Sequence, residues 1–340
     1  MQRTLTTVLA LACGLNPDIS QAQTSEEPLE EIIVTGEHAG PGMWQVTHPD
    51  HPGHTLWIVG EPPLLPNGMY FRSQKVAQVA AQSQEILGRT SVSLKPDEKV
   101  GVFRMLTLVP AALKLRKNPD KATLQELIPP DIYARWLVQK KLYLGRDSGV
   151  EKMRPIVAAE RLRNAAIEKL QVGYGGSWPE VWEHVRTKKI PVTSPTLEYI
   201  FKTDNLRGQI KAASRQKLAD GECFARTVEF TEALSNKQVE DARARAWATG
   251  DLAKLTELPP LPDHESACDQ AIVNALAMTT EVPADVGEQL DESWLAAAGN
   301  ALTKNESTLA FVPMSDLLWE HGYLESLRKR GYEILAPGID

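Results

Sequence analysis

The chain has 340 residues, of which 42% are hydrophobic and 24% charged, and its formal net charge is −7. Such a composition is typical of a soluble globular protein, and the length allows one large domain or two smaller ones. The acidic balance argues against a nucleic-acid partner, because nucleic-acid-binding proteins concentrate basic residues on one face.

The first 22 residues have the pattern of a signal peptide. Arg3 precedes a short apolar core at 5–15, and Ser20-Gln21-Ala22 places small residues where a signal peptidase would cut. The apolar core is too short to span a bilayer, and no later stretch is long and apolar enough to do so. We therefore expect cleavage after Ala22, no transmembrane segment and a periplasmic protein. The alternative is a lipoprotein, because Ala10-Leu11-Ala12-Cys13 loosely resembles a lipobox that would acylate Cys13.

Residues 23–41 form a polar linker around a short β-like run. Two strands are then predicted, at 43–47 and 54–60, joined by the Pro- and Gly-containing loop that carries His48, His51 and His54. Regular histidine spacing suggests a metal site, but the loop residues between them favour a solvated hairpin.

The second predicted strand ends at Gly60-Glu61-Pro62-Pro63. Glu61 is either a carboxylate at a strand end, where α/β sheets gather their sites, or an exposed turn residue. The apolar spacing over 72–87 predicts a helix after this turn.

The stretch from about 98 to 305 is mostly helical in pattern, and only 190–194 within it reads as a strand. The predicted helices cover 131–143, 151–171, 178–188, 204–218, 222–234, 237–249, 264–280 and 290–303. The chain closes with a buried strand at 307–313, an amphipathic helix at 319–330 and a strand in the segment YEILAP. Strand–helix units at both ends, with a helical insertion between them, predict an α+β domain over 42–337 whose terminal strands share a mixed sheet.

Two cysteines, Cys223 and Cys268, remain after the predicted cleavage. An even count in an exported protein favours a disulfide, and two buried free thiols are the alternative. A catalytic thiol is not expected, because no motif surrounds either cysteine.

Four segments together resemble the TraB/GumN family, relatives of the TIKI proteases and of the erythromycin-esterase/ChaN-like superfamily. These segments are PGMWQVTHPDHPGHTLWIVGEPPLLP, AWATGDLAKLTELP, SWLAAAGNALTKNESTLAFVP and LLWEHGYLESLRKRGYEILAP. The resemblance implies a site in which a G-x-x-H histidine, a glutamate after the next strand and a second histidine hold a divalent metal that activates water.

This chain departs from that pattern at each ligand position. Pro63 replaces the first histidine, and Gly88-Arg89 follow the strand where the family tends to place its glutamate, although nearby Glu85 blurs the comparison. Val312-Pro313-Met314-Ser315 replaces the second G-x-x-H motif, and Asp316 follows it. No catalytic, metal or cofactor-binding residue is carried over.

The resemblance therefore predicts a degenerate, non-catalytic binding or accessory protein of a Gram-negative cell envelope. Its partner would be an envelope protein or a small ligand. The alternative is a metal-dependent or rearranged-site hydrolase of peptide or ester bonds that uses Glu61, Asn300 or Asp316.

Overall fold

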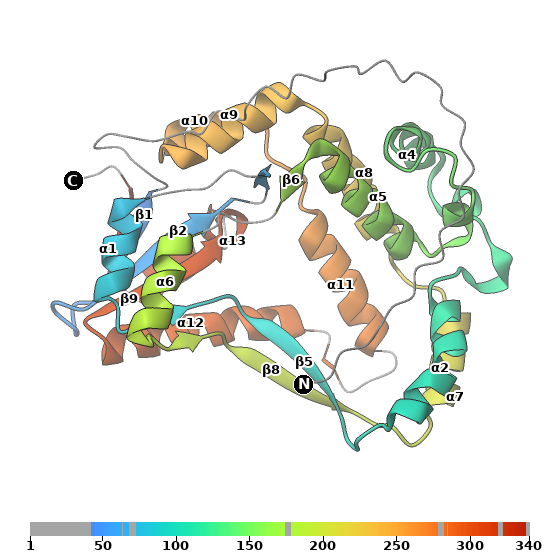
Figure 1. Cartoon of the computed structure of the whole chain (residues 1–340), viewed down its shortest axis with the longest axis horizontal. Helices are drawn as coiled ribbons and strands as arrows, with labels where there is room; N and C mark the ends of the chain where they lie inside the picture. The colour runs from blue at the N-terminus through green and yellow to red at the C-terminus, as the bar shows by residue number, and fades with distance from the viewer. Residues whose placement is uncertain are drawn as a thin grey trace, which may run out of the picture. The chain divides into compact units, whose positions relative to one another are not determined.

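The protein was analysed as a computed structural model that describes residues 42–62, 64–67, 73–173, 178–277, 282–283, 285–318 and 322–337. Its main sheet has six strands in the order β10-β1-β2-β9-β4-β7. These strands are β1 (Met43–Thr47), β2 (Thr55–Glu61), β4 (Glu85–Leu87), β7 (Val192–Thr193), β9 (Ser307–Pro313) and β10 (Glu333–Leu335). The predicted α+β class is confirmed (Figure 1).

The late strand β9 lies in the middle of the sheet, between β2 and β4. It runs parallel to both, and β4 runs parallel to β7, whereas β1 pairs antiparallel with β2 and β10. The prediction that strands from the two ends of the chain share a mixed sheet is therefore confirmed.

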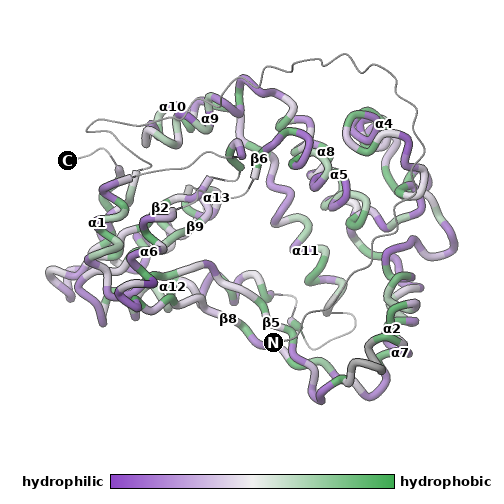
Figure 2. Tube along the Cα trace, in the orientation of Figure 1, coloured by the Kyte–Doolittle hydropathy of each residue, from purple (hydrophilic) through white to green (hydrophobic). Residues whose placement is uncertain are grey.

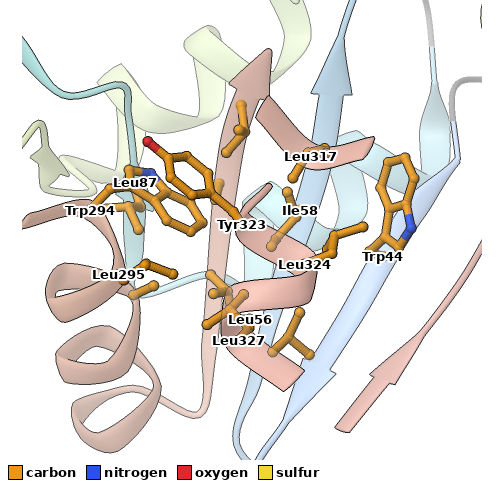
Figure 3. Close-up of a cluster of buried hydrophobic side chains, with 14 of the residues drawn as sticks. Trp44, Leu56, Ile58, Leu87, Trp294, Leu295, Leu317, Tyr323, Leu324 and Leu327 are labelled. Atoms are coloured by element: carbon orange, nitrogen blue, oxygen red, sulfur yellow. The ribbon is translucent and has the colours of Figure 1, made fainter. Parts of the chain in front are cut away.

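Alternating side chains of the central strands build two cores, one on each face of the sheet. Val59, Leu309 and Phe311 belong to a core that includes side chains from α1 (Gln74–Gln82), α6 (Pro179–Lys188) and α9 (Lys237–Ala248). Leu56, Ile58 and Ala310 face α12 (Val286–Lys304) and α14 (Tyr323–Lys329) on the other side (Figure 3). Helices thus cover both faces, which explains why β2 and β9 are apolar nearly throughout.

A third core lies in the helical insertion and centres on the ring contact between Trp136 and Phe224. Its elements are α3 (Leu124–Leu127), α4 (Pro130–Tyr143), η2 (Gly149–Lys152), α5 (Pro155–Leu170), α8 (Gly221–Leu234) and α11 (His264–Ala277). The short elements β3 (Leu65–Pro66), β6 (Val172–Gly173), η1 (Pro119–Lys121), α10 (Leu252–Glu257) and α13 (Met314–Leu318) complete the connections. Within the described residues, none of the helices combines the length and apolar character needed to cross a bilayer.

Two strand–helix segments, one after β4 and one after β7, lie side by side in a way that the sequence did not predict. From β4 the chain continues into β5 (Ser91–Pro96) and α2 (Val102–Leu115), and from β7 into β8 (Thr196–Phe201) and α7 (Leu206–Arg215). The strands β5 and β8 pair in parallel, and α2 packs against α7 (Figure 1).

The predicted helix 72–87 is wrong at its carboxyl end. Helix α1 begins after its N-cap Ser73 and ends at Gln82, and residues 85–87 form β4. Ile86 and Leu87 are fully buried because they add a strand beside β9, so tertiary pairing overrides the local helical spacing.

Candidate functional site

The parallel strands β2, β9 and β4 have their carboxyl ends at one edge of the sheet. Glu61 at the end of β2 lies opposite Pro313 at the end of β9, and Leu87 at the end of β4 lies opposite Ala310. The segments Gly88-Arg89 and Met314–Asp316 leave the sheet at this same edge. Open α/β sheets place their ligands there, so this edge is the candidate site.

The side chain of Met314 packs closely on the glycine before Glu61. A Cβ atom at Gly60 would lie 2.7 Å from the Cε and 2.8 Å from the Sδ of Met314, the first residue of α13. Met314 also contacts both sheet cores. Because β2 runs through Glu61, which pairs with Pro313, the Gly60-Glu61 segment is a strand end, which the turn interpretation of Glu61 did not predict.

Glu61 and Arg89 form an ion pair across the sheet edge. The guanidinium donates from Nη2 at 2.9 Å and from Nε at 3.1 Å to the Oε2 atom of Glu61. The Glu61 side chain is 17% exposed and that of Arg89 49%. Burial raises the pKa of the nearby Asp316 carboxyl, and the positive charge of Arg89 partly opposes that rise. The Arg89 guanidinium thus interacts with two carboxylates near strand ends, those of Glu61 and Asp316.

The other site residues that the sequence predicted do not all lie at this edge. Asp316 lies at this edge, whereas Asn300 is exposed six residues beyond Trp294 on α12, about 9 Å further along the helix. Pro63 lies outside the described residues. Glu85 begins β4 at the opposite edge, where its Oε2 accepts a hydrogen bond from Asn305 at 2.8 Å. Glu85 therefore cannot substitute for a glutamate after β4.

A cavity of about 710 Å³ opens at the carboxyl edge. Its walls come from the residues after β4 and β9 and from helices α11, α12 and α14. Among the described residues, five carboxylates and one basic residue, Arg89, line it; the carboxylates are Asp263, Glu265, Asp269, Asp291 and Asp316. We call this cavity the acidic cleft.

Three carboxyl groups of the acidic cleft have raised pKa values. Burial is the main cause at Asp269, Asp291 and Asp316, and it outweighs the hydrogen bond that Asp316 accepts from the Ser315 hydroxyl. Solvent still reaches these side chains from the cleft, although the surrounding walls remove part of their hydration. The negative charges of Glu265 and Asp263 raise the pKa of Asp269 further. A bound cation would relieve this repulsion.

An unpaired indole N–H forms part of the cleft wall. Trp294 is 1% exposed, and its Nε1 atom has no hydrogen-bond partner among the described residues. Its ring stacks on Tyr323 with centroids 4.3 Å apart, and the Tyr323 hydroxyl donates to Asp291 Oδ1 at 2.9 Å. The indole nitrogen and this hydroxyl lie at the same end of the stacked pair (Figure 3). The wall therefore presents a buried donor beside carboxylate acceptors.

The hairpin histidines pack against α12 and the end of the sheet. His54 Nδ1 lies 2.8 Å from the carbonyl oxygen of Leu302, His51 Nε2 lies 3.3 Å from the Thr303 hydroxyl, and the ring of His48 contacts Tyr332 edge-on. In the part of the chain that the structure describes, no group of three His, Cys, Asp or Glu side chains could hold a metal ion.

A disulfide joins Cys223 on α8 to Cys268 on α11. It closes a loop between positions 45 residues apart. It also fixes α11, the helix whose Glu265 and Asp269 line the acidic cleft, onto the third core.

The model of the TraB/PrgY/gumN family matches residues 42–336. The chain belongs to the TraB/PrgY/gumN family. No characterised protein and no solved structure matches it at a significant level.

The sequence did not predict the Glu61–Arg89 pair or the cleft residues Asp291, Trp294 and Tyr323. One signal was available, because Glu265 and Asp269 are four residues apart and so lie on one face of α11. No local sequence pattern, however, predicts that α11 lies near the end of β9.

Proposed function

We propose that this TraB/PrgY/gumN protein is an exported, non-catalytic binding protein that holds a small cationic ligand in the acidic cleft. The observation that carries the proposal is the Glu61–Arg89 ion pair. A metal-dependent hydrolase would use this sheet edge for a divalent cation with an open coordination position. Here a guanidinium, which offers no such position, neutralises the strand-end carboxylate.

Export is supported by two independent features. The first 22 residues have the charge, apolar core and small residues of a signal peptide. The Cys223–Cys268 disulfide belongs to an oxidising compartment such as the periplasm. We therefore place the protein in the periplasm after cleavage at Ala22. Acylation at Cys13 is the alternative, and an intact-mass measurement on the exported protein distinguishes the two.

The chemistry of the ligand follows from the cleft wall. Five carboxylates with one arginine favour a positively charged group, and the Nε1 donor of Trp294 favours a carbonyl or another acceptor beside it. A basic amino-acid side chain next to its own peptide carbonyl provides both. We infer a lysine- or arginine-bearing ligand.

A titration calorimetry experiment with a short lysine peptide tests the binding. We expect D291N to weaken binding, because the substituted amide would keep an oxygen acceptor for Tyr323 but lose the charge of Asp291. The matched control is E292Q, since Glu292 is paired with Arg330 and does not line the cleft. Equal loss in both variants, or no binding by the parent protein, would refute the cationic-ligand assignment.

A metal analysis tests the loss of catalysis separately. We expect the purified protein to carry no stoichiometric divalent ion and to hydrolyse neither peptide nor ester substrates. A bound ion in one-to-one ratio, or a hydrolytic activity that E61Q or D316N abolishes, would instead favour the alternative hydrolase, with either a metal or a rearranged site.

A further inference from the structure

The pair of helices α2 and α7 differs in charge from the rest of the chain. Residues 102–117 and 202–217, which contain these helices and the residues next to them, hold nine basic residues and one acidic residue. They carry a formal charge of +8 in a protein whose net charge is −7. We call these two segments the basic helix pair.

The cations of this pair are available to a partner. Among the described residues, no ion pair connects a carboxylate to any of Lys114, Arg116, Lys117, Lys202, Arg207, Lys211, Arg215 or Lys217. Elsewhere many cations are neutralised; Arg135, for example, is paired with both Glu229 and Glu232 on α8.

Helix α2 has two apolar faces. Leu108, Ala111 and Leu115 share one face and are half-buried, as expected for the side that packs on α7. The opposite face carries Leu106, Val109 and Leu113, which are 61%, 48% and 54% exposed. Their spacing of three and four residues makes a continuous stripe along the helix. Figure 2 shows hydrophobic and hydrophilic residues alternating along this pair.

The pair is anchored by one buried arginine. Arg154, which is 3% exposed, donates from Nε to the carbonyl oxygen of Leu115 at 2.7 Å. Its Nη2 and Nη1 atoms donate to the carbonyl oxygens of Ala213 and Gln216, each at 2.9 Å. Arg154 thus holds the carboxyl ends of both helices against the start of α5, so the exposed stripe is presented on a fixed support.

We propose that the basic helix pair binds the surface of an anionic bilayer, with the stripe of Leu106, Val109 and Leu113 entering the headgroup region. An exposed apolar stripe on a cationic helix pair is the pattern of an interfacial helix, and the cations supply the attraction to acidic lipids. A second copy of the chain is disfavoured as the occupant, because two surfaces of charge +8 would repel each other. Binding of this kind needs no membrane-spanning helix and does not depend on the acidic cleft.

Co-sedimentation of the purified chain with phosphatidylglycerol vesicles tests the proposal, with phosphatidylcholine vesicles in parallel. We expect binding to the first, weakening as salt is added, and little to the second. Because each basic residue near an anionic surface contributes about 1 kcal/mol, K114E/K117E, which changes two lysines of the segment that carries the stripe, should weaken binding at least about 25-fold. The control K237E/K254E makes the same charge change at lysines that are paired with Asp241 and Glu257.

The apolar stripe is tested by L106S/V109S/L113S, for which we expect at least a roughly tenfold loss of vesicle binding. The control L137S/V138S/L142S removes the same number of exposed apolar side chains from α4. Circular dichroism confirms that each variant is folded.

Four results would overturn the proposal. One is a failure to bind phosphatidylglycerol vesicles, and another is an equal loss in the α2 and α4 variants. The third is binding of soluble polyglutamate that matches vesicle binding and survives the stripe substitutions, which would identify an acidic polymer or protein as the partner. A dimer seen by sedimentation and abolished by L106S/V109S/L113S would likewise assign the stripe to self-association.

Discussion

The indole N–H of Trp247 donates a hydrogen bond to the carbonyl oxygen of Gly60 at 2.7 Å. The two residues are 187 positions apart and belong to two of the four segments that resemble the TraB/GumN family. Trp247 is 1% exposed at the end of α9, and Gly60 is the last residue of β2 before Glu61. This bond fixes the strand end from which the candidate site is built.

Replacing Trp247 with phenylalanine should destabilise the fold. The change leaves the buried Gly60 carbonyl without its donor, which costs about 1–3 kcal/mol, and the smaller ring adds a cavity cost. Urea unfolding followed by circular dichroism measures the difference. The control W182F changes a tryptophan that is 37% exposed on α6, and it should alter the free energy of unfolding much less. Equal effects of the two substitutions would contradict this role for Trp247.

Arg89→Glu should create affinity for divalent cations at the sheet edge. The substitution removes the guanidinium bound to Glu61 and adds a third carboxylate near Glu61 and Asp316. We expect Mn²⁺ to bind this variant at least roughly tenfold more tightly than the parent protein, as measured by calorimetry. K95E, which changes an exposed lysine on β5, is the control. Tight Mn²⁺ binding by the parent protein would show that the guanidinium does not replace a metal.

His264 should make the protein less stable in weak acid. Burial, and next the charge of Arg163, lower the pKa of this histidine from 6.5 to about 4. Between these values the unfolded chain binds the extra proton, so the stability from neutral His264 is full above pH 6.5 and is lost as the pH falls towards 4. The difference amounts to about 3 kcal/mol.

His264→Phe removes that titration while keeping a ring to stack on Phe230, whose centroid lies 3.9 Å away. Unfolding free energies measured at several pH values should therefore fall less steeply with acid in the variant than in the parent. Subtracting the two curves cancels the acidic groups of the cleft, whose raised pKa values act in the opposite direction. H184F controls for the introduction of a phenylalanine. Parallel curves for H264F and the parent would contradict the prediction.

Removal of the disulfide should loosen the third core. For a loop of this length the chain-entropy model gives about 4 kcal/mol of stabilisation, so C223A/C268A should lower the midpoint of urea unfolding substantially. Mass spectrometry after alkylation, with and without reductant, shows whether the bond is present in the purified protein. A stoichiometric free thiol at either cysteine before reduction would refute the pairing.

The main strands were predictable because each is an apolar run bounded by turn residues. The boundaries of β9 match the predicted 307–313, and β2 differs from its prediction by one residue at each end. By contrast, β5 and β8 escaped prediction because they form an exposed two-stranded ribbon. Ser91 pairs with Thr196 and Lys95 with Glu198 across it, and its apolar side chains are exposed or only half-buried.

The candidate site could be predicted only in part. Glu61 and Asp316 follow strands that the sequence reveals, so their place at a strand end was foreseeable. The contact of Arg89 with Glu61 depends on the strand order β2-β9-β4, which places a strand from the end of the chain between two early ones. The acidic residues of α11 reach the cleft through long-range packing that no local pattern encodes.

The central position of β9 controls when this protein can fold. Strands β2 and β4 are joined only through β9, so the sheet stays incomplete until the chain has been synthesised past residue 313. Contacts of such long sequence separation form slowly. If the chain is exported as proposed, slow closure of the sheet keeps it unfolded for longer, as a secretion channel that accepts only unfolded polypeptide requires.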